Sequence, residues 1–172
     1  METKTIQLTK GYTTIVDSAD YEWLSSFNWC SDVRDDGRKV YAVRGIRKDG
    51  KKSIVRMHRF ITGVTDTKIQ VDHKDSDGLN NSRENLRVCN HLQNCFNSKR
   101  GVSNTSGFKG VTLHKPTGLW RATIAVEGKQ VSLGYFKTKE PAALAYDHAC
   151  VKYFGEFARP NEKQLDSSLV LV

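Results

Sequence analysis

The segment SKRGVSNTSG, residues 98–107, constrains the fold most strongly because it contains small and polar side chains and no large hydrophobic one. Such a segment cannot contribute to a core and is typical of a flexible linker. A chain of 172 residues with 38% hydrophobic residues can form one ordinary domain or two to three small ones. We therefore expect two parts with separate cores, joined by a linker over residues 99–107.

Before this segment, apolar and polar residues alternate in short runs that end at turns, which is typical of antiparallel strands. Residues 5–17 and residues 38–61 each predict a pair of strands, and the second pair is joined by the Lys-Asp-Gly turn at 48–50. Residues 17–27, DSADYEWLSSF, predict a short helix between the two pairs. We expect a basic, β-rich N-terminal part over residues 1–60.

After the segment, residues 107–136 contain three alternating runs separated by the turns KPTG and EGK. A helix is expected to begin at Thr138 and to stop at Gly155. The chain is therefore predicted to be α+β. A three-stranded antiparallel sheet with one helix should occupy residues 108–161, and residues 162–172 should form a tail.

The net charge of +8 is unevenly distributed, with ten Lys or Arg against three acids between Arg34 and Arg59. In the strand pair of residues 38–61, basic residues alternate with apolar ones. This predicts one core face and one positive face, which either contacts a nucleic-acid backbone or is merely solvated. An intracellular basic protein of this kind most often has nucleic acid as its partner.

Targeting signals and disulfides are not indicated. No run of about 18 apolar residues predicts a membrane span, and the N-terminus METKTIQLTKG has no apolar core of a secretion signal. The four Cys form no CxxC pair, which favours free thiols in a reducing compartment. We expect a cytoplasmic protein with no membrane partner, and the sequence indicates no protein partner.

The stretch VDHKDSDGLNNSRENLRVCNHLQN, residues 71–94, concentrates the side chains that bind metal ions. Its Asp-x-Asp-Gly run resembles a calcium-binding EF-hand loop, but His73 stands where calcium requires a carboxylate and a strand-like run precedes it. A polar surface loop explains the polarity but not the order of the residues.

A β-β-α unit explains the order better. Asp72 and His73 end one short β-like run, Asn85 begins a second, and Asn90 can cap a following helix. That helix would present His91, Asn94 and Asn97 on one face. One carboxylate and one amide suit a hard cation such as Mg²⁺, and a neighbouring histidine can take a proton from water.

The spacing of these residues, with Asn85 twelve residues after His73 and Asn94 nine further on, resembles the HNH endonucleases with a ββα-metal site, particularly the homing type. The resemblance implies that His73 is the general base and that Asn85 positions it. It implies that Asp72 and Asn94 bind Mg²⁺ or another hard divalent cation such as Mn²⁺. Asn94 replaces the final His of many members, and the Cys pairs of some members are absent. The HNH unit is expected over residues 61–98.

Three further residues of this region have two interpretations each. His91 either contacts the phosphate or lies on the helix surface. His58, in the run RMHRFI, either reaches the active site or packs in the core. Asn97 either supports the site and contacts a phosphate or has no part in it.

Residues 107–161 resemble the AP2 DNA-binding domain through the runs FKGV, W-x-A-x-I, LGYF and AALAYDHA and through Asn161. The resemblance implies a sheet that enters the major groove of double-stranded DNA with the helix packed behind it. Strand alternation predicts that Trp120, Ala122, Ile124 and Val126 face the helix. The outward, DNA-facing candidates are Lys109, Thr112, His114, Arg121, Thr123, Gln130 and Ser132.

The outward face departs from the plant-type pattern, because Thr112, Thr123, Ala125 and Ser132 stand where Arg and Trp occur there. Bidentate contacts of Arg with guanine are each worth roughly 1–3 kcal/mol of discrimination. We therefore expect a different target sequence and looser specificity.

These features together predict a metal-dependent DNA endonuclease that hydrolyses a phosphodiester bond and is targeted by the AP2-like part. One catalytic unit per chain predicts a nick, and the architecture resembles mobile HNH nucleases of phage and bacterial genomes. The alternatives are a non-catalytic DNA-binding regulator with a degenerate HNH unit and an RNA-binding protein that uses the same basic surfaces.

Overall fold

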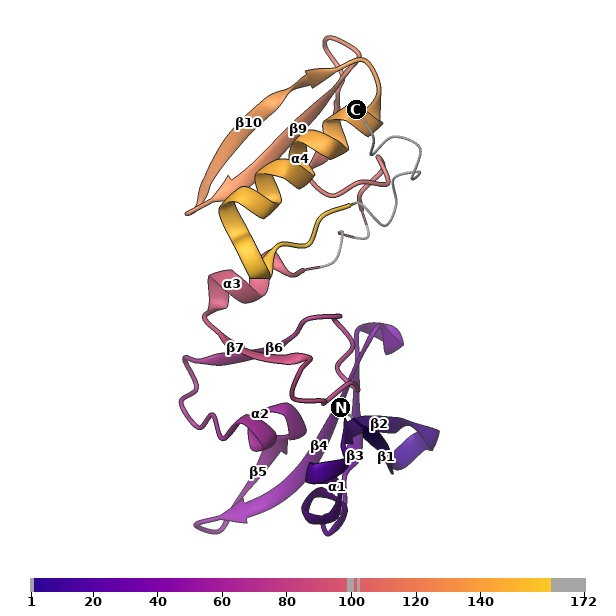
Figure 1. Ribbon diagram of the computed structural model, residues 1–172, viewed down its shortest axis with the longest axis vertical. Helices are drawn as coiled ribbons and strands as arrows, with labels where there is room; N and C mark the ends of the chain where they lie inside the picture. Colours follow the sequence, from indigo (N-terminus) through magenta and orange to yellow (C-terminus); the bar gives the residue numbers. More distant parts are fainter. Residues whose placement is uncertain (1, 99–100, 102, 162–172) are drawn as a thin grey trace. The chain divides into compact units, whose positions relative to one another are not determined.

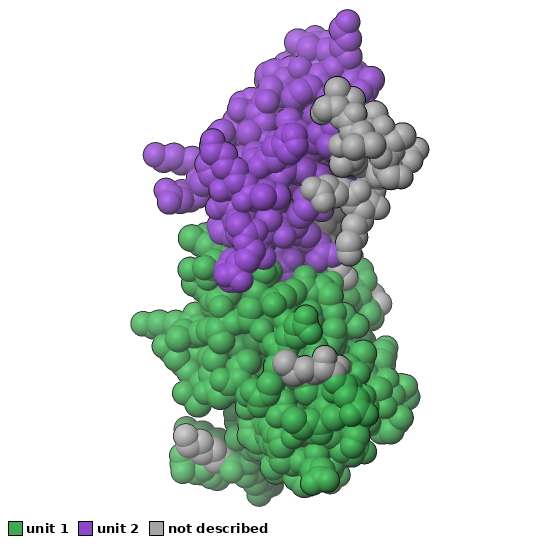
Figure 2. Space-filling view, in the orientation of Figure 1, with its two compact units in different colours: residues 1–94 green, residues 95–172 purple. Residues whose placement is uncertain are grey.

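The computed structural model describes residues 2–98, 101 and 103–161, and it divides the chain into two compact units, Met1–Asn94 and Cys95–Val172 (Figures 1 and 2). Residues 99, 100 and 102 of the expected linker and the whole expected tail, 162–172, lie outside the described residues. Both units combine antiparallel β-sheet with helices, so the expected α+β class is confirmed.

Unit 1 contains three small antiparallel sheets, in the orders β1-β2, β3-β4-β5 and β6-β7. Its strands and helices are β1 (Thr3–Gln7), β2 (Thr13–Asp17), α1 (Ser18–Ser25), β3 (Cys30–Arg34), β4 (Lys39–Lys48), β5 (Lys51–Arg56), α2 (Met57–Thr62), β6 (Gln70–His73) and β7 (Leu86–Cys89), with 3-10 turns at Thr9–Gly11 and Asp35–Gly37.

Two expectations for unit 1 need correction. The strand predicted to run to residue 61 ends at Arg56, and α2 follows, because Met57, His58 and Ile61 are buried at helical spacing and Gly63 ends the turn in the left-handed region. Arg44 does not lie on the positive face of β4. Its guanidinium stacks 3.9 Å above the Phe27 ring, in an aromatic cluster that includes Phe60 and Trp29.

The loop of residues 74–85, between β6 and β7, lies along β2. The Ile15 amide donates to Leu79 O and the Asn81 amide donates to Ile15 O, both at 2.8 Å. The Arg83 amide donates to the Asp17 carboxylate at 2.9 Å. Asp17 stands at the N-cap position of α1 and makes no cap hydrogen bond there. The N-terminal strands therefore fix the shape of this loop.

Unit 2 contains one three-stranded antiparallel sheet, in the order β10-β9-β8, with a long helix across one face (Figure 1). The boundary between the units falls within α3. The helix α3 is His91–Phe96, and the elements that lie wholly in unit 2 are β8 (Val111–His114), β9 (Leu119–Val126), β10 (Lys129–Phe136), α4 (Lys139–Phe154) and a 3-10 turn at Gly155–Phe157.

The helix α4 packs through small residues on the sheet, as the sequence predicts. Ala142 and Ala143 contact Ala122 and Val111 in one buried cluster, and Tyr146 packs with Ile124 in another. Thr138 precedes α4 and Gly155 ends it, which confirms the expected limits. In the part of the chain that the structure describes, no helix is long and apolar enough to cross a membrane.

Asn161 and Asp147 close unit 2. The Asn161 amide and side-chain Nδ2 donate to Asp147 Oδ1 at 2.7 and 2.9 Å. Asn161 Oδ1 accepts from the Lys109 amide at 2.8 Å, so it joins α4 to the segment before β8. Both side chains are buried.

Replacement of Gly110 is expected to destabilise unit 2. It has φ of +77°, and an added Cβ would collide with the Tyr146 ring. Gly118 has φ of +69° with open space around it, so it is a control with similar backbone strain. Gly110→Ala should destabilise unit 2 by about 1–3 kcal/mol more than Gly118→Ala, because overpacking adds to the shared strain. Hydrogen exchange of the amides in β8, β9 and β10 measures this difference, and equal effects would contradict it.

Candidate functional site

The candidate site is built on the β6–β7 ribbon and the helix α3, which together form the expected β-β-α unit. Asp72 pairs with Arg87 and His73 pairs with Leu86 across the ribbon. Asn90 caps α3 reciprocally: its Oδ1 accepts from the Gln93 amide, and Gln93 Oε1 accepts from the Asn90 amide, both at 2.9 Å. The expected capping by Asn90 is therefore confirmed.

One face of the ribbon carries a buried ion pair. Asp72 Oδ2 accepts from Arg87 Nη2 at 2.8 Å and from Arg87 Nε at 3.0 Å. Both side chains are less than a tenth exposed. The ion pair anchors the Asp72 carboxylate, because charge-assisted hydrogen bonds in a low dielectric hold their geometry well.

Asn94 reaches the same face of the ribbon through Gln70. Its Nδ2 donates to Gln70 Oε1 at 2.7 Å, and Gln70 Nε2 lies 3.4 Å from His91 Nδ1. Gln70 and Asp72 are two residues apart on β6, so their side chains share a face. The structure thus brings Asp72, Asn94 and His91 to one side.

The opposite face carries a cluster of rings. The His58 and His73 rings are nearly perpendicular with centroids 4.9 Å apart, and Tyr41 lies about 6 Å from both. His73 Nε2 lies 3.3 Å from Asn81 Oδ1. His58 therefore lies beside the site histidine.

Burial keeps both imidazoles neutral. Desolvation, together with the charge of a protonated His73, lowers the pKa of His58 to about 3. Desolvation also lowers the pKa of His73, against the opposing effect of its hydrogen bond to Asn81. A neutral imidazole can accept a proton, so His73 is in the form that a general base requires.

The expected β-β-α unit should bring Asp72, His73 and Asn94 toward one point, but the side chains of Asp72 and His73 point to opposite faces of β6. Successive side chains of a strand point to opposite faces, and the contacts of Asp72 and His73 agree with this alternation. Both residues lie at the end of β6, where the ribbon stops. A phosphate at this end could be approached by Asp72 from one side of the strand and by His73 from the other. Asn97 follows the last residue of α3 instead of sharing its face, and it is buried.

The Asn85 side chain forms hydrogen bonds within the loop of residues 74–85. Its Oδ1 accepts from the Asp75 amide at 3.1 Å, and its Nδ2 donates to Asn80 O at 2.8 Å and to Asp75 Oδ1 at 3.0 Å. The carboxylates of Asp75 and Asp77 accept loop amides two residues ahead. These acids serve turn geometry, which agrees with our preference against a calcium loop.

Asn81 is the site residue that sequence reasoning missed. It is fully buried and contacts His73, whereas the prediction assigned the positioning of His73 to Asn85. The only signal in the sequence is the pair of asparagines in the loop, and either of them can form a turn.

The donor set suits a hard cation. The Asp72 carboxylate and the Asn94 carbonyl are oxygen donors, and the bond from Asn94 Nδ2 to Gln70 turns the nitrogen of that amide away. Among the described residues, no three His, Cys, Asp or Glu side chains come together as a metal cluster. A cation here would bind one carboxylate and one amide and take its other ligands from water and phosphate, as Mg²⁺ does.

The sheet of unit 2 presents a continuous outward face. Thr112 pairs with Arg121, and Arg121 pairs with Tyr135, so these three form a row across the strands. The other predicted outward residues follow in register, with Ser132 opposite Thr123 and Gln130 opposite Ala125. His114 packs edge-on against Tyr135 at 5.1 Å. Tyr135, which is 47% exposed, was missed because a bulge between Ser132 and Gly134 shifts its register.

Lys109 corrects one expectation for this face. It precedes β8 and is not an outward residue of that strand. Its ammonium donates to Phe96 O at 2.8 Å and to Ser98 O at 2.9 Å, and burial lowers its pKa. Lys109 therefore donates hydrogen bonds to backbone carbonyls near the end of α3, because these groups would otherwise be left without donors.

A ribbon and helix with an imidazole, a carboxylate and two amides at the strand end define a ββα-metal type of unit. The family model described as "HNH endonuclease" matches residues 57–95. The chain belongs to the HNH endonuclease family, and its C-terminal part is AP2-like.

Three relatives illustrate this composition. The chain is 37% identical over 89 residues to "Protein 3.8" of Escherichia phage T7, which covers 52% of this chain and 73% of that protein. It is 34% identical over 113 residues to "Uncharacterized HNH endonuclease L560" of Acanthamoeba polyphaga mimivirus, covering 63% and 58%. It is 49% identical over 59 residues to "AP2-like ethylene-responsive transcription factor TOE2" of Arabidopsis thaliana, covering 34% and 12%.

The chain therefore spans less than two thirds of the mimivirus protein and about an eighth of the plant factor. No solved structure is significantly similar to it.

The buried pair of Asp72 and Arg87 should matter far more for stability than an exposed pair. Arg87→Leu leaves a buried carboxylate without its cation and should cost about 3–5 kcal/mol of unfolding free energy. Arg34→Leu removes the cation of the exposed Arg34–Asp32 pair and should cost less than about 1 kcal/mol. Urea unfolding of the full chain compares the two variants, and similar losses would contradict the role of burial.

Proposed function

We propose that the protein is a metal-dependent DNA endonuclease that hydrolyses one phosphodiester bond, and that its AP2-like unit brings it to DNA. The observation that carries this proposal is the buried His73 imidazole at the end of β6, next in sequence to Asp72, whose carboxylate lies on the other face of the strand. Membership of the HNH endonuclease family supports it.

His73 is the proposed general base, which takes a proton from the attacking water. Asp72 and Asn94 would hold Mg²⁺ or Mn²⁺. When bound, the ion stabilises negative charge on the phosphate and on the leaving 3′ oxygen. Asn85 acts on the site through the loop of residues 74–85, because its hydrogen bonds fix the loop at Asp75 and Asn80.

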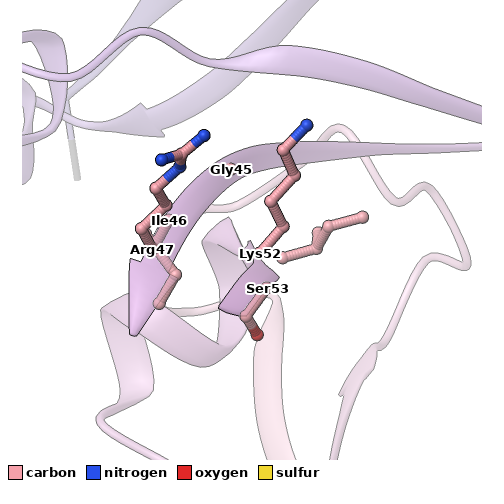
Figure 3. A pocket seen from close by; sticks show the side chains of 6 residues that line it. Gly45, Ile46, Arg47, Lys52 and Ser53 are labelled. Atoms are coloured by element: carbon pink, nitrogen blue, oxygen red, sulfur yellow. The ribbon is translucent and has the colours of Figure 1, made fainter. Parts of the chain in front are cut away.

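The β4–β5 hairpin is the proposed contact of unit 1 with the DNA backbone. Arg47 and Lys52 are directly opposite in register, and like charges in such a pair repel each other. Figure 3 shows their charged ends extending to the same side of the hairpin. Both residues line an open groove of about 490 Å³ together with Gly45 and Ile54. A phosphate between the two cations would relieve their repulsion.

The outward sheet face of unit 2, with the row Thr112, Arg121 and Tyr135, is the proposed reader of double-stranded DNA. The active site grips one scissile phosphate and gains little sequence information from it. A tethered reader raises the effective concentration of the active site near a chosen sequence. Because each chain has one site, a nick is the proposed product, as in a homing type of nuclease.

A non-catalytic DNA-binding regulator is the second candidate. It is favoured by the hydrogen bonds of Arg87 to Asp72, which compete with a cation for that carboxylate. The catalytic proposal is preferred because His73, Asp72, Asn85 and Asn94 all retain the chemistry that the reaction needs.

The proposal is tested on supercoiled plasmid incubated with the protein and Mg²⁺. Open-circle product that disappears with EDTA is expected. His73→Ala should lower the rate of nicking by roughly 10²–10⁴ with DNA affinity nearly unchanged, because a general base contributes about this factor. His148→Ala, at an exposed position on α4, is the matched control and should nick normally. Plasmid that stays intact but is retarded on a gel, with Mg²⁺ and with Mn²⁺, would favour the regulator.

The hairpin contact predicts a specific salt dependence. Each phosphate neutralised on double-stranded DNA contributes about −0.9 to the slope of log K against log salt concentration. Arg47→Ala should make the slope shallower by about 0.9. Lys152→Ala, on the exposed face of α4, should leave it unchanged. Fluorescence anisotropy with labelled duplex at several salt concentrations measures both slopes, and an unchanged slope for Arg47→Ala would exclude the hairpin from the interface.

A further inference from the structure

Asn81 connects the site histidine to the N-terminal strands. Its side chain has no exposed surface, and its Oδ1 lies 3.3 Å from His73 Nε2. Its Nδ2 lies 2.7 Å from Thr14 Oγ1 on β2 and 3.4 Å from Gly78 O. Its backbone amide is held by Ile15 O at 2.8 Å. Asn81 therefore has little freedom to move relative to His73.

The Thr14 hydroxyl determines which way the Asn81 amide faces. Thr14 is fully buried, and its hydroxyl donates its single proton to Leu79 O at 2.7 Å. Toward Asn81 the hydroxyl oxygen can then only accept. Gly78 O is a carbonyl and can also only accept. Both neighbours require the NH₂ group of Asn81 on their side, so its carbonyl oxygen faces His73.

The orientation of Asn81 in turn determines where the proton of His73 lies. A carbonyl oxygen has no proton to give, so His73 Nε2 must be the donor in this contact. A neutral imidazole carries one proton, so Nδ1 then keeps its lone pair. The nearly perpendicular His58 ring packs against the His73 ring and restricts its rotation.

We propose that Asn81, held by Thr14, is the positioning residue that keeps His73 in the Nε2–H tautomer and so makes Nδ1 the atom that accepts the proton. This inference rests on the proposed endonuclease function. In the step it describes, a water O–H bond breaks and its proton goes to Nδ1. The water oxygen bonds to phosphorus, and the 3′ oxygen leaves with the electron pair of its broken bond and takes a proton from solvent.

The tautomer can be measured without any activity assay. In protein labelled with [¹⁵N]histidine, long-range ¹H–¹⁵N NMR spectra distinguish the two tautomers of each neutral ring, and His73→Gln assigns the signals of His73. We expect wild-type His73 to be the Nε2–H tautomer. Asn81→Leu, which keeps the size but removes the acceptor, should give a mixture of tautomers. An Nδ1–H tautomer in the wild type, or an unchanged tautomer in Asn81→Leu, would overturn the proposal.

Kinetics distinguish positioning from general support of the fold. Asn81→Leu should lower kcat in proportion to its loss of the Nε2–H tautomer, about twofold for an equal mixture, with KM nearly unchanged, because only the ring population with a lone pair on Nδ1 can act as the base. Thr14→Val, an isosteric change that removes the hydroxyl, should shift the tautomer in the same direction, and it supplies the test if Asn81→Leu does not fold. An effect on KM alone would contradict the proposal.

The two proposals can fail separately. If the wild type does not nick plasmid but His73 is the Nε2–H tautomer and Asn81→Leu changes it, the endonuclease proposal fails and the positioning by Asn81 stands. If the wild type nicks and the tautomer is insensitive to Asn81, only the positioning proposal fails.

Discussion

The docking of the loop of residues 74–85 onto β2 is the constraint on which the His73 side of the site depends. A polar loop of this length is held because its backbone groups find partners on β2, at Ile15 and Asp17. The same contact brings the Thr14 hydroxyl to Asn81. The N-terminal strands thus support the proposed site although they supply none of the residues of the HNH motif, and they form one compact unit with it from Met1 to Asn94.

The β6 strand separates two electrostatic environments that the proposed chemistry needs at once. On one face, the charge of Asp72 is kept beside the Arg87 cation. On the other, His73 lies among His58, Tyr41 and Asn81, where desolvation favours the neutral ring. Consecutive Cα atoms are only about 3.8 Å apart, so the end of one strand carries a charged ligand on one side and a neutral base on the other. The alternation of side chains along one strand provides this separation, so it requires no contact between residues distant in sequence.

Local patterns predicted most of the fold, and long-range contacts account for what they missed. Alternation and turn residues gave the hairpins, the unit 2 sheet and the limits of α4, because each of these is set by neighbours in sequence. The strand-like run that ends at His73, the run that begins at Asn85 and the cap Asn90 predicted the β-β-α unit in the same way. The roles of Asn81 and Arg87 depend on pairing with Thr14 and Asp72, which no periodicity encodes. The helix α2 was read as a strand because its short run MHRFI fits either period.

Charge was the least specific of these signals, and the structure explains why. Several cationic side chains bind groups of the protein itself. Arg83 forms a bidentate ion pair with Asp20. Arg59 donates hydrogen bonds to the carbonyls of Asp66 and Ile69, and Lys109 donates to those of Phe96 and Ser98. These residues count toward the net charge of +8 but already bind partners within the protein. Arg47 and Lys52 differ, because they face each other in register and no acid among the described residues forms an ion pair with either. A repulsive pair of this kind destabilises the folded protein in the absence of a ligand. Binding of a polyanion would offset this repulsion.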